Sequence, residues 1–310
     1  MIKKTLCFSN PMYLSLRNDQ LVLHIPDVET NDALPDLIKK EAERTIPIED
    51  IGVVVLDNRR ITITTGALEA LLDNNCAVVT CDKKSMPVGL MLPLSGNTVQ
   101  NERFRHQLDA SLPLRKQLWQ QTIKQKILNQ ERVLASATSQ ETQCMKVWAA
   151  QVRSGDPDNM EAYAAAYYWK KLFSQIDGFT RDREGMAPNN LLNYGYAILR
   201  AVIARALVGS GLLPTLGIHH HNRYNAYCLA DDVMEPYRPY VDQLVISTMH
   251  LVEDYSVITQ EIKKYLLGIP MLDVMIGGRR SPLMIAAQQT TSSLYKCFTG
   301  ELRQIIYPEM

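Results

Sequence analysis

The first third of the chain alternates short runs of branched apolar residues with polar turn residues. Val, Ile, Leu and Thr dominate these runs, a composition that favours strands. One short helix, Ala67–Leu72, is predicted among them, because it ends in Asp73-Asn74-Asn75, residues suited to a cap and a turn. The pattern therefore predicts a β-rich domain with strands at Tyr13–Arg17, Gln20–Ile25, Gly52–Leu56, Ile61–Thr64, Ala77–Cys81 and Val88–Leu92.

The pattern changes after Pro93-Leu94-Ser95-Gly96-Asn97. From there apolar residues recur with helical period, and clusters of β-branched residues become rare. We place a domain boundary at this change, with residues 1–95 forming the β-rich domain and residues 96–310 a larger all-α domain. The predicted fold class is α+β.

Helices are predicted over four stretches of the second part. They are Val99–Ala110, a helix carrying the apolar stripe Trp119, Ile123, Ile127 and Leu134, a helix from Asp156-Pro157 through Glu161 to Phe173, and Asn189–Val208 with a stop at Gly209 and Gly211. Pro113 is expected to stop the first. A hairpin with a Gly-Gly turn follows in MLDVMI-GG-RRSPLM, and Ser281-Pro282 opens a last helix that reaches past Leu302.

Four cations are interspersed with the apolar stripe of the second helix: Lys116, Lys124, Lys126 and Arg132. A charge row of this kind is either a solvated face or a surface that faces nucleic acid. The whole chain has 33 basic and 33 acidic residues. Because phosphate binding usually draws on a basic excess, any DNA-binding face must be local or shared with a partner.

The composition describes a folded intracellular protein. A chain of 310 residues with 46% hydrophobic residues is long enough for two domains or one large one, and can bury a substantial core. The six cysteines lie far apart, with no C-x-x-C pair, and indicate thiols in a reducing cytosol. The first residues lack the apolar stretch of a signal peptide, and nothing approaches roughly 20 unbroken apolar residues. We expect a cytoplasmic protein that does not insert into a membrane.

The densest group of possible metal ligands lies in residues 216–242. Three consecutive histidines, His219 to His221, cannot all face one ion, because neighbouring side chains point in different directions. Asp232 and Glu235 share a face if their stretch is helical, although the nearby prolines leave its start open. One imidazole with carboxylates suits Mn²⁺ or Mg²⁺ better than structural zinc. The alternative is that these residues, listed in full as His219, His220, His221, Asp231, Asp232, Glu235 and Asp242, are helix caps and surface groups.

Glu161 lies in MEAYAAAYYWKKLF, on the same side of its helix as Ala165, Tyr168 and Leu172. A carboxylate on an apolar stripe costs several kcal/mol when it is buried alone, so it needs a cation or a metal. Alternatively, it rotates to the rim of the stripe and meets a lysine or arginine.

These residues and several longer motifs resemble one family, the CRISPR-associated integrases of spacer acquisition (Cas one), in their type II branch. The resemblance covers essentially the whole chain. It rests on NRRITITTGALEALLDNNCAVVTCDKKSMPVGLMLP, MEAYAAAYYWKKLF, FTR at Phe179–Arg181, NNLLNYGYAILRAVIARALVGSGLLPTLGIHH and NAYCLADDVMEPYRPYVD. The last two motifs together are highly specific.

The resemblance implies a β-sandwich for dimerisation, followed by a helical catalytic domain. Carried over position by position, the family's catalytic metal ligands fall on Glu161, His220 and Glu235, with Asp232 in support. His219 and His221 receive no role beyond shaping the loop. The implied cofactor is Mg²⁺ or Mn²⁺.

The implied reaction is an attack by the 3′ hydroxyl of a short invading DNA on a phosphodiester at the edge of a CRISPR repeat. The implied partners are double-stranded DNA (protospacer and repeat), a second copy of the chain, the small protein Cas two and the type II effector nuclease Cas nine. Asn222 and Arg223 are either phosphate contacts or merely exposed loop residues. A hydrolytic nuclease and a non-enzymatic DNA-binding scaffold remain the alternatives.

Overall fold

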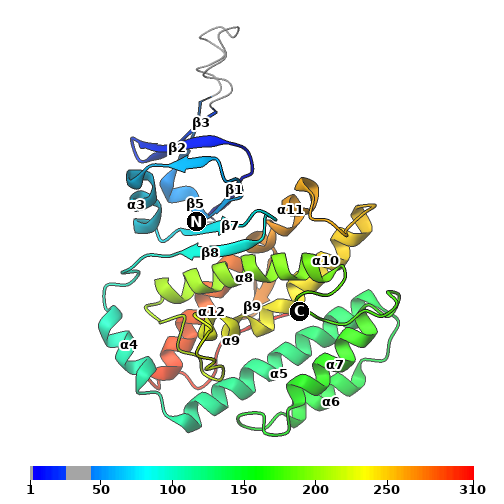
Figure 1. Cartoon of the computed structure of the whole chain (residues 1–310). Coiled ribbons are helices and arrows are strands. Elements are labelled where there is room, and N and C mark those ends of the chain that lie inside the picture. The colour runs from blue at the N-terminus through cyan, green and yellow to red at the C-terminus, as the bar shows by residue number, and fades with distance from the viewer. Residues whose placement is uncertain (1–2, 26–42) are drawn as a thin grey trace. The chain divides into compact units, whose positions relative to one another are not determined.

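The computed structural model describes residues 3–25 and 43–310, and the chain divides into two compact units, Met1–Gly96 and Asn97–Met310. Strands dominate the first unit and helices the second (Figure 1). The predicted α+β fold class, a β-rich part followed by a larger helical part, is confirmed. The second unit is not purely helical, because β9, β10 and β11 form a small sheet in it.

The described strands of the first unit form two four-stranded sheets. In the order β1-β5-β7-β8, β5 pairs in parallel with β1 and β7, and β8 is antiparallel to β7. In the order β4-β3-β2-β6, only β2 and β6 are parallel. The strands are β1 (Lys4–Phe8), β2 (Met12–Arg17), β3 (Gln20–His24), β4 (Arg44–Pro47), β5 (Ile51–Leu56), β6 (Ile61–Ile63), β7 (Ala77–Cys81) and β8 (Pro87–Met91), and a short 3₁₀ turn, η1 (Ile48–Asp50), precedes β5.

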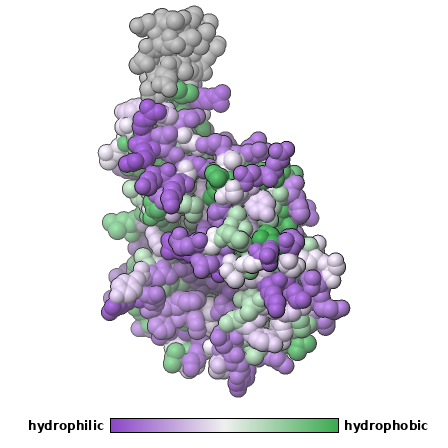
Figure 2. Space-filling view, turned by 45° about the vertical axis from the view of Figure 1, so that its right-hand side comes forward, coloured by the Kyte–Doolittle hydropathy of each residue, from purple (hydrophilic) through white to green (hydrophobic). Residues whose placement is uncertain are grey.

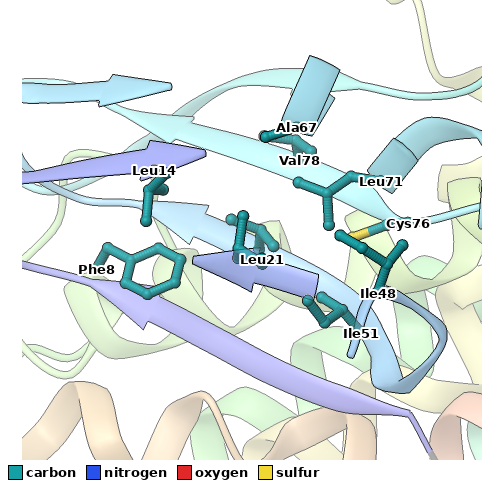
Figure 3. Packing of buried hydrophobic residues seen from close by; sticks show 10 residues of the cluster. Phe8, Leu14, Leu21, Ile48, Ile51, Ala67, Leu71, Cys76 and Val78 are labelled. Carbon is teal, nitrogen blue, oxygen red and sulfur yellow. The ribbon is translucent and has the colours of Figure 1, made fainter. Parts of the chain in front are cut away.

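A buried cluster joins the two sheets into one core (Figure 3). Leu14 and Leu21 come from one sheet, and Phe8 and Ile51 come from the other. Helix α3 (Thr65–Asp73) adds Leu71 to the same cluster. Side chains from facing sheets that share one core define a sandwich-like arrangement.

All the strands predicted for this unit form, with slightly different ends. The sequence pattern missed β1 and β4. Both are edge strands, and they bury little: β4 has no fully buried residue, and β1 has only Phe8. A strand paired on one side and half exposed shows no apolar run for pattern analysis to detect.

Helix α8 (Asn189–Gly209) is the central helix of the second unit and contacts α9, α10 and α12. Among the described residues it alone has the length and hydropathy of a membrane span, but 78% of its apolar window is buried. It is therefore a core helix. It ends at Gly209, as predicted, and Gly211 follows in a left-handed conformation at φ +70°.

The other helices of this unit are α4 (Gln100–Leu108), α5 (Leu112–Ala137), α6 (Gln143–Gln151), α7 (Met160–Leu172), α9 (Cys228–Met234), α10 (Arg238–Leu251), α11 (Gln260–Leu266) and α12 (Leu283–Phe298), with the 3₁₀ turns η2 (Glu235–Tyr237) and η3 (Ile269–Met271). These helices lie in groups: α9, α10, α11 and α12 pack against α8, α6 and α7 pack against α5, and α4 packs against α12 (Figure 1). The surface in Figure 2 is mostly hydrophilic, with scattered apolar spots.

Helix α5 buries the predicted stripe of Trp119, Ile123, Ile127 and Leu134. This face packs against α7, α10 and η2, so the helix lies beside every element that carries a carboxylate of the candidate site. The preceding helix ends near Pro113, as predicted, at Leu108. Pro113 lies in the first turn of α5, where a missing N–H has no consequence.

Two helix ends differ from prediction. Helix α7 begins at Met160 rather than at Asp156-Pro157, because Asp156 and Asn159 adopt left-handed conformations that form a turn before it. Helix α12 ends at Phe298 and does not reach past Leu302, because Gly300 turns the chain away at φ +79°.

The predicted hairpin is present. β9 (Asp273–Ile276) and β10 (Arg279–Pro282) pair antiparallel across Gly277 and Gly278, which have positive φ of 55° and 74°. Such a turn requires residues that tolerate positive φ. β11 (Pro308–Glu309) pairs with the other side of β9, a contact that the local pattern did not indicate.

Candidate metal centre

Glu161 lies in the first turn of α7, where free amide groups and the helix dipole favour a carboxylate. Asp156 accepts hydrogen bonds from the amides of Met160 and Glu161 at 2.9 and 3.0 Å, and so holds the start of the helix. The Glu161 side chain is 23% exposed and accepts a hydrogen bond from Lys126 at 2.6 Å. The carboxylate is thus paired with a lysine at the edge of the apolar stripe.

Glu235 lies at the break between α9 and α10, as the first residue of η2. Pro236 and Pro239 each occupy the first turn of a helical segment, so neither interrupts a helix. Asn129 of α5 donates a hydrogen bond to the Pro236 carbonyl at 2.7 Å and ties the break to α5. The Glu235 carboxylate is buried, with the Arg238 Nε 2.9 Å away.

Lys126 of α5 joins the two glutamates. Its Nζ lies 2.6 Å from Glu161 Oε1 and 2.6 Å from Glu235 Oε2, and its side chain is 9% exposed. Carboxylates from α7 and η2 therefore meet at the position of one small cation. Burial lowers the pKa of Lys126, but the charges of Glu235 and Glu161 outweigh it, and the pKa lies above its usual value. Lys126 is therefore not on a solvated face, unlike the other three cations of the row, Lys116, Lys124 and Arg132, which are exposed.

His220 is oriented by Asp232 of α9. The His220 Nδ1 lies 2.5 Å from Asp232 Oδ1, and the same buried carboxylate accepts hydrogen bonds from the amides of His219 and His220. In the neutral ring, Nδ1 donates to Asp232, so Nε2 keeps its lone pair, as in metal-binding histidines. The hydrogen bond to Asp232 raises the pKa of His220 above its usual value, with the charges of Asp232, Glu235 and Glu161 adding to it and burial opposing it.

The loop that carries His220 is held tightly. Gly217 lies so close to Asp232 that a Cβ on it would be 2.7 Å from Oδ2 and would also overlap the His220 carbonyl oxygen. Trp119 stacks on the ring of His219, with centroids 4.1 Å apart and planes at 2°, and meets His220 edge-on. Burial lowers the pKa of His219. Gly217 is therefore required for the close approach of His220 and Asp232, because a Cβ at this position would overlap atoms of both residues.

A cavity of about 310 Å³ opens beside His220. Arg115 of α5 and Arg223 of the loop line it, together with His221 and Asn222. The buried Nε of Arg115 has no hydrogen-bond partner among the residues that the structure describes. This pair of arginines gives the site a local cationic edge, although the net charge of the whole chain is zero.

Comparison with known proteins identifies the family of the chain. The family model described as CRISPR associated protein Cas1 matches residues 8–254. The chain belongs to the Cas1 family. A relative from Neisseria meningitidis serogroup C (strain 8013), "CRISPR-associated endonuclease Cas1", is 38% identical over 281 residues, which are 88% of this chain and 90% of the relative. The predicted family is confirmed, and the type II assignment is consistent with this relative.

Further relatives and solved structures are similar at lower identity. "CRISPR-associated endonuclease Cas1 2" of Pyrobaculum aerophilum is 31% identical over 66% of this chain and 74% of the relative. Among solved structures, a casposase bound to integration product has a TM-score of 0.77 at 20% identity and covers 98% of this chain and 92% of its own. A Cas1 protein from Thermotoga maritima has a TM-score of 0.73 at 14% identity, with 96% and 97% covered. These structures share the fold.

The site of this Cas1 family member has the donor types that a divalent cation needs. Among the described residues, no three His, Cys, Asp or Glu side chains form a group ready to hold a metal ion. However, Glu235 Oε2 is buried and receives no aligned hydrogen bond from the described residues, although the Lys126 ammonium is close to it. Two carboxylates around one cation position, beside an imidazole with a free Nε2, fit Mg²⁺ or Mn²⁺. The ligand set Glu161, His220 and Glu235 stays a prediction.

The local pattern missed two parts of this Cas1 site. Lys126 was detectable, because it lies three residues after Ile123 and next to Ile127, within the apolar stripe of α5. The partners of Asp232 and Glu235 were not detectable from their spacing. Asp232 contacts His220, whereas Glu235 contacts Lys126 and Arg238.

Proposed function

We propose that this Cas1 family member is a metal-dependent DNA endonuclease and integrase that inserts short invading DNA into a CRISPR array by phosphodiester transesterification. The Neisseria relative is named a CRISPR-associated endonuclease, and the casposase of similar fold is bound to integration product. The observation that carries the proposal is the meeting of Glu161 and Glu235 at one cation position, next to His220 held by Asp232.

Mg²⁺ or Mn²⁺ is the proposed cofactor, held by Glu161, Glu235 and His220. When bound, such an ion polarises a phosphoryl oxygen and activates a hydroxyl. The chain's own residues then position the reactants. Asp232 holds Nδ1–H of His220, so that in the neutral ring the lone pair of Nε2 is directed away from Asp232, and Arg115 holds a neighbouring phosphate of the DNA. A protein accelerates phosphoryl transfer mainly by positioning the reactants and by stabilising the charge that develops in the transition state.

The proposed partners are double-stranded DNA (protospacer and repeat), a second copy of this chain, Cas2 and the type II effector nuclease Cas9. Solved structures of similar fold include a Cas6-RT-Cas1–Cas2 complex, with a TM-score of 0.74 and 18% identity, and a TtCas1–DNA complex, with 0.59 and 16%. Joining two DNA ends to two strands requires two sites at a fixed distance. A partner protein would also supply positive charge that this chain lacks overall.

The test is an integration assay with a labelled duplex oligonucleotide and a plasmid that carries the CRISPR repeat, in Mg²⁺, in Mn²⁺ and in chelator. The wild type, with Cas2 present, should join the label to the plasmid only when the metal is added. Glu161→Gln, His220→Ala and Glu235→Gln should each lose the joined product by at least about 100-fold. Glu253→Gln, at an exposed glutamate outside the site, is the matched control and should retain activity.

The assay separates the alternatives by product. A hydrolytic nuclease would cut the DNA in the presence of metal and leave no label covalently joined to the plasmid. A DNA-binding scaffold would retard the oligonucleotide in a gel, and the three substitutions would change nothing. Either result overturns the integrase proposal.

A further inference from the structure

The charges around Lys126 already balance. Glu161 and Glu235 contribute two negative charges, and Lys126 and Arg238 contribute two positive charges, all within direct ion-pair contact. Lys126 and Glu235 are buried, so their interactions are weakly screened by solvent. A divalent cation bound to the same two carboxylates would bring two further positive charges. The cluster has no net negative charge to offset them.

Position also puts Lys126 and a divalent cation in competition. The ammonium lies 2.6 Å from an oxygen of each glutamate, so it occupies the space between the two carboxylates that would hold an ion. Two cations at one such position repel each other strongly at this low dielectric. Lys126 must therefore leave the carboxylate pair before both glutamates can ligate an ion.

The face of α5 that carries Lys126 is buried. Lys126 lies eleven residues after Arg115, close to three full turns, and Leu118, Trp119 and Thr122 between them on this face are 0 to 1% exposed. The exposed side of the ion-pair cluster is at Glu161, whose side chain is 23% exposed. The flexible four-carbon stem of lysine allows the ammonium to leave the carboxylates on that side.

We propose that Lys126 is an internal counterion that holds the two glutamates in the metal-free protein and competes with a divalent cation for them. The inference rests on the proposed function, because it requires a metal at this site. Its consequence is that Lys126 weakens metal binding while it keeps the carboxylate pair assembled in the metal-free protein.

The test measures Mn²⁺ binding to the full chain by calorimetry. Lys126→Met should bind Mn²⁺ at least about tenfold more tightly than the wild type, because the competing charge between the two carboxylates is gone. Lys124→Met removes the same charge from an exposed position of the same helix and should behave like the wild type.

A second readout is the melting temperature. Metal-free Lys126→Met leaves two carboxylates without their shared partner, so it should melt below the wild type, and Mn²⁺ should raise its melting temperature more than that of the wild type. If this variant does not fold without metal, folding on addition of Mn²⁺ is the same result in a stronger form. Lys126→Arg, which keeps the charge, should retain weak Mn²⁺ binding.

The outcomes separate the two proposals. If Lys126→Met binds Mn²⁺ no more tightly than the wild type, the counterion role is wrong, even where the wild type still makes the joined product. If the wild type binds no Mn²⁺ and makes no joined product, the metal-dependent function itself fails.

Discussion

His220 and Asp232 are joined by a contact of 2.5 Å between Nδ1 and Oδ1, at the centre of the candidate site. The carboxylate is fully buried, and it also accepts two backbone amides of the histidine loop. Asp232 therefore fixes both the position of the loop and the tautomer of the ring. A carboxylate behind a histidine is the usual way in which proteins orient an imidazole for a metal.

Asp232→Asn should lower the pKa of His220, because the hydrogen bond to the anion is the main cause of its raised value. An NMR titration of the histidine ring protons measures this directly, with the exposed His250 as internal control. A folded-state pKa above the unfolded value stabilises the protein fully below about pH 6.5, and the contribution is lost as the pH rises through the folded pKa. The stability difference between wild type and variant should therefore be larger at pH 5.5 than at pH 8. An unchanged His220 pKa would contradict the assigned role of Asp232.

Gly217→Ala should destabilise the helical unit and disturb His220. The added Cβ would overlap the His220 carbonyl and lie 2.7 Å from Asp232 Oδ2, and neither group can move without breaking their contact. We expect a loss of about 1–3 kcal/mol in the free energy of unfolding, measured with urea. Gly66→Ala is the control, because nothing lies within 4 Å of its added Cβ. Equal effects at both glycines would contradict the predicted steric cause.

Asp242→Asn should change the pH dependence of stability. Burial raises the pKa of Asp242 to about 6 from the usual 3.8, although hydrogen bonds from Tyr196 and Tyr168 oppose the rise. Because the folded pKa is raised, the contribution is fully present below pH 3.8 and is lost as the pH rises through about 6. The wild type should lose on the order of 3 kcal/mol relative to the variant between pH 4 and pH 7. Denaturant unfolding at several pH values measures this difference, and a difference that stays constant with pH would rule out the titration.

Arg115→Ala should weaken binding to duplex DNA without loss of stability. Arg115 lines the cavity beside His220, and its buried Nε lacks a partner in the described residues, so removing it relieves a small desolvation cost. The slope of log affinity against log salt concentration should fall by about one, as for the loss of one phosphate contact. Arg132→Ala, on the same helix but outside this cavity, is the control. Equal slopes for both variants would exclude a specific phosphate contact at Arg115.

Much of the fold was predictable because its signals are local. The period of Trp119, Ile123 and Ile127 predicted a buried helical face, and α5 has that face. The two glycines after β9 predicted a hairpin through their tolerance of positive φ. Edge strands such as β1 and β11 were missed, because a short strand with one neighbour is defined by its partner rather than by its own residues.

The sequence by itself determined the fold class, the positions of the main helices and the kinds of side chain at the candidate site. Only the tertiary structure decided which of them meet. Lys126, Glu161 and Glu235 lie on three elements, and whether their charges pair depends on how α5, α7 and η2 pack. Spacing along the chain reports neighbours within one helix or strand, whereas a buried ion pair depends on distances that only packing sets.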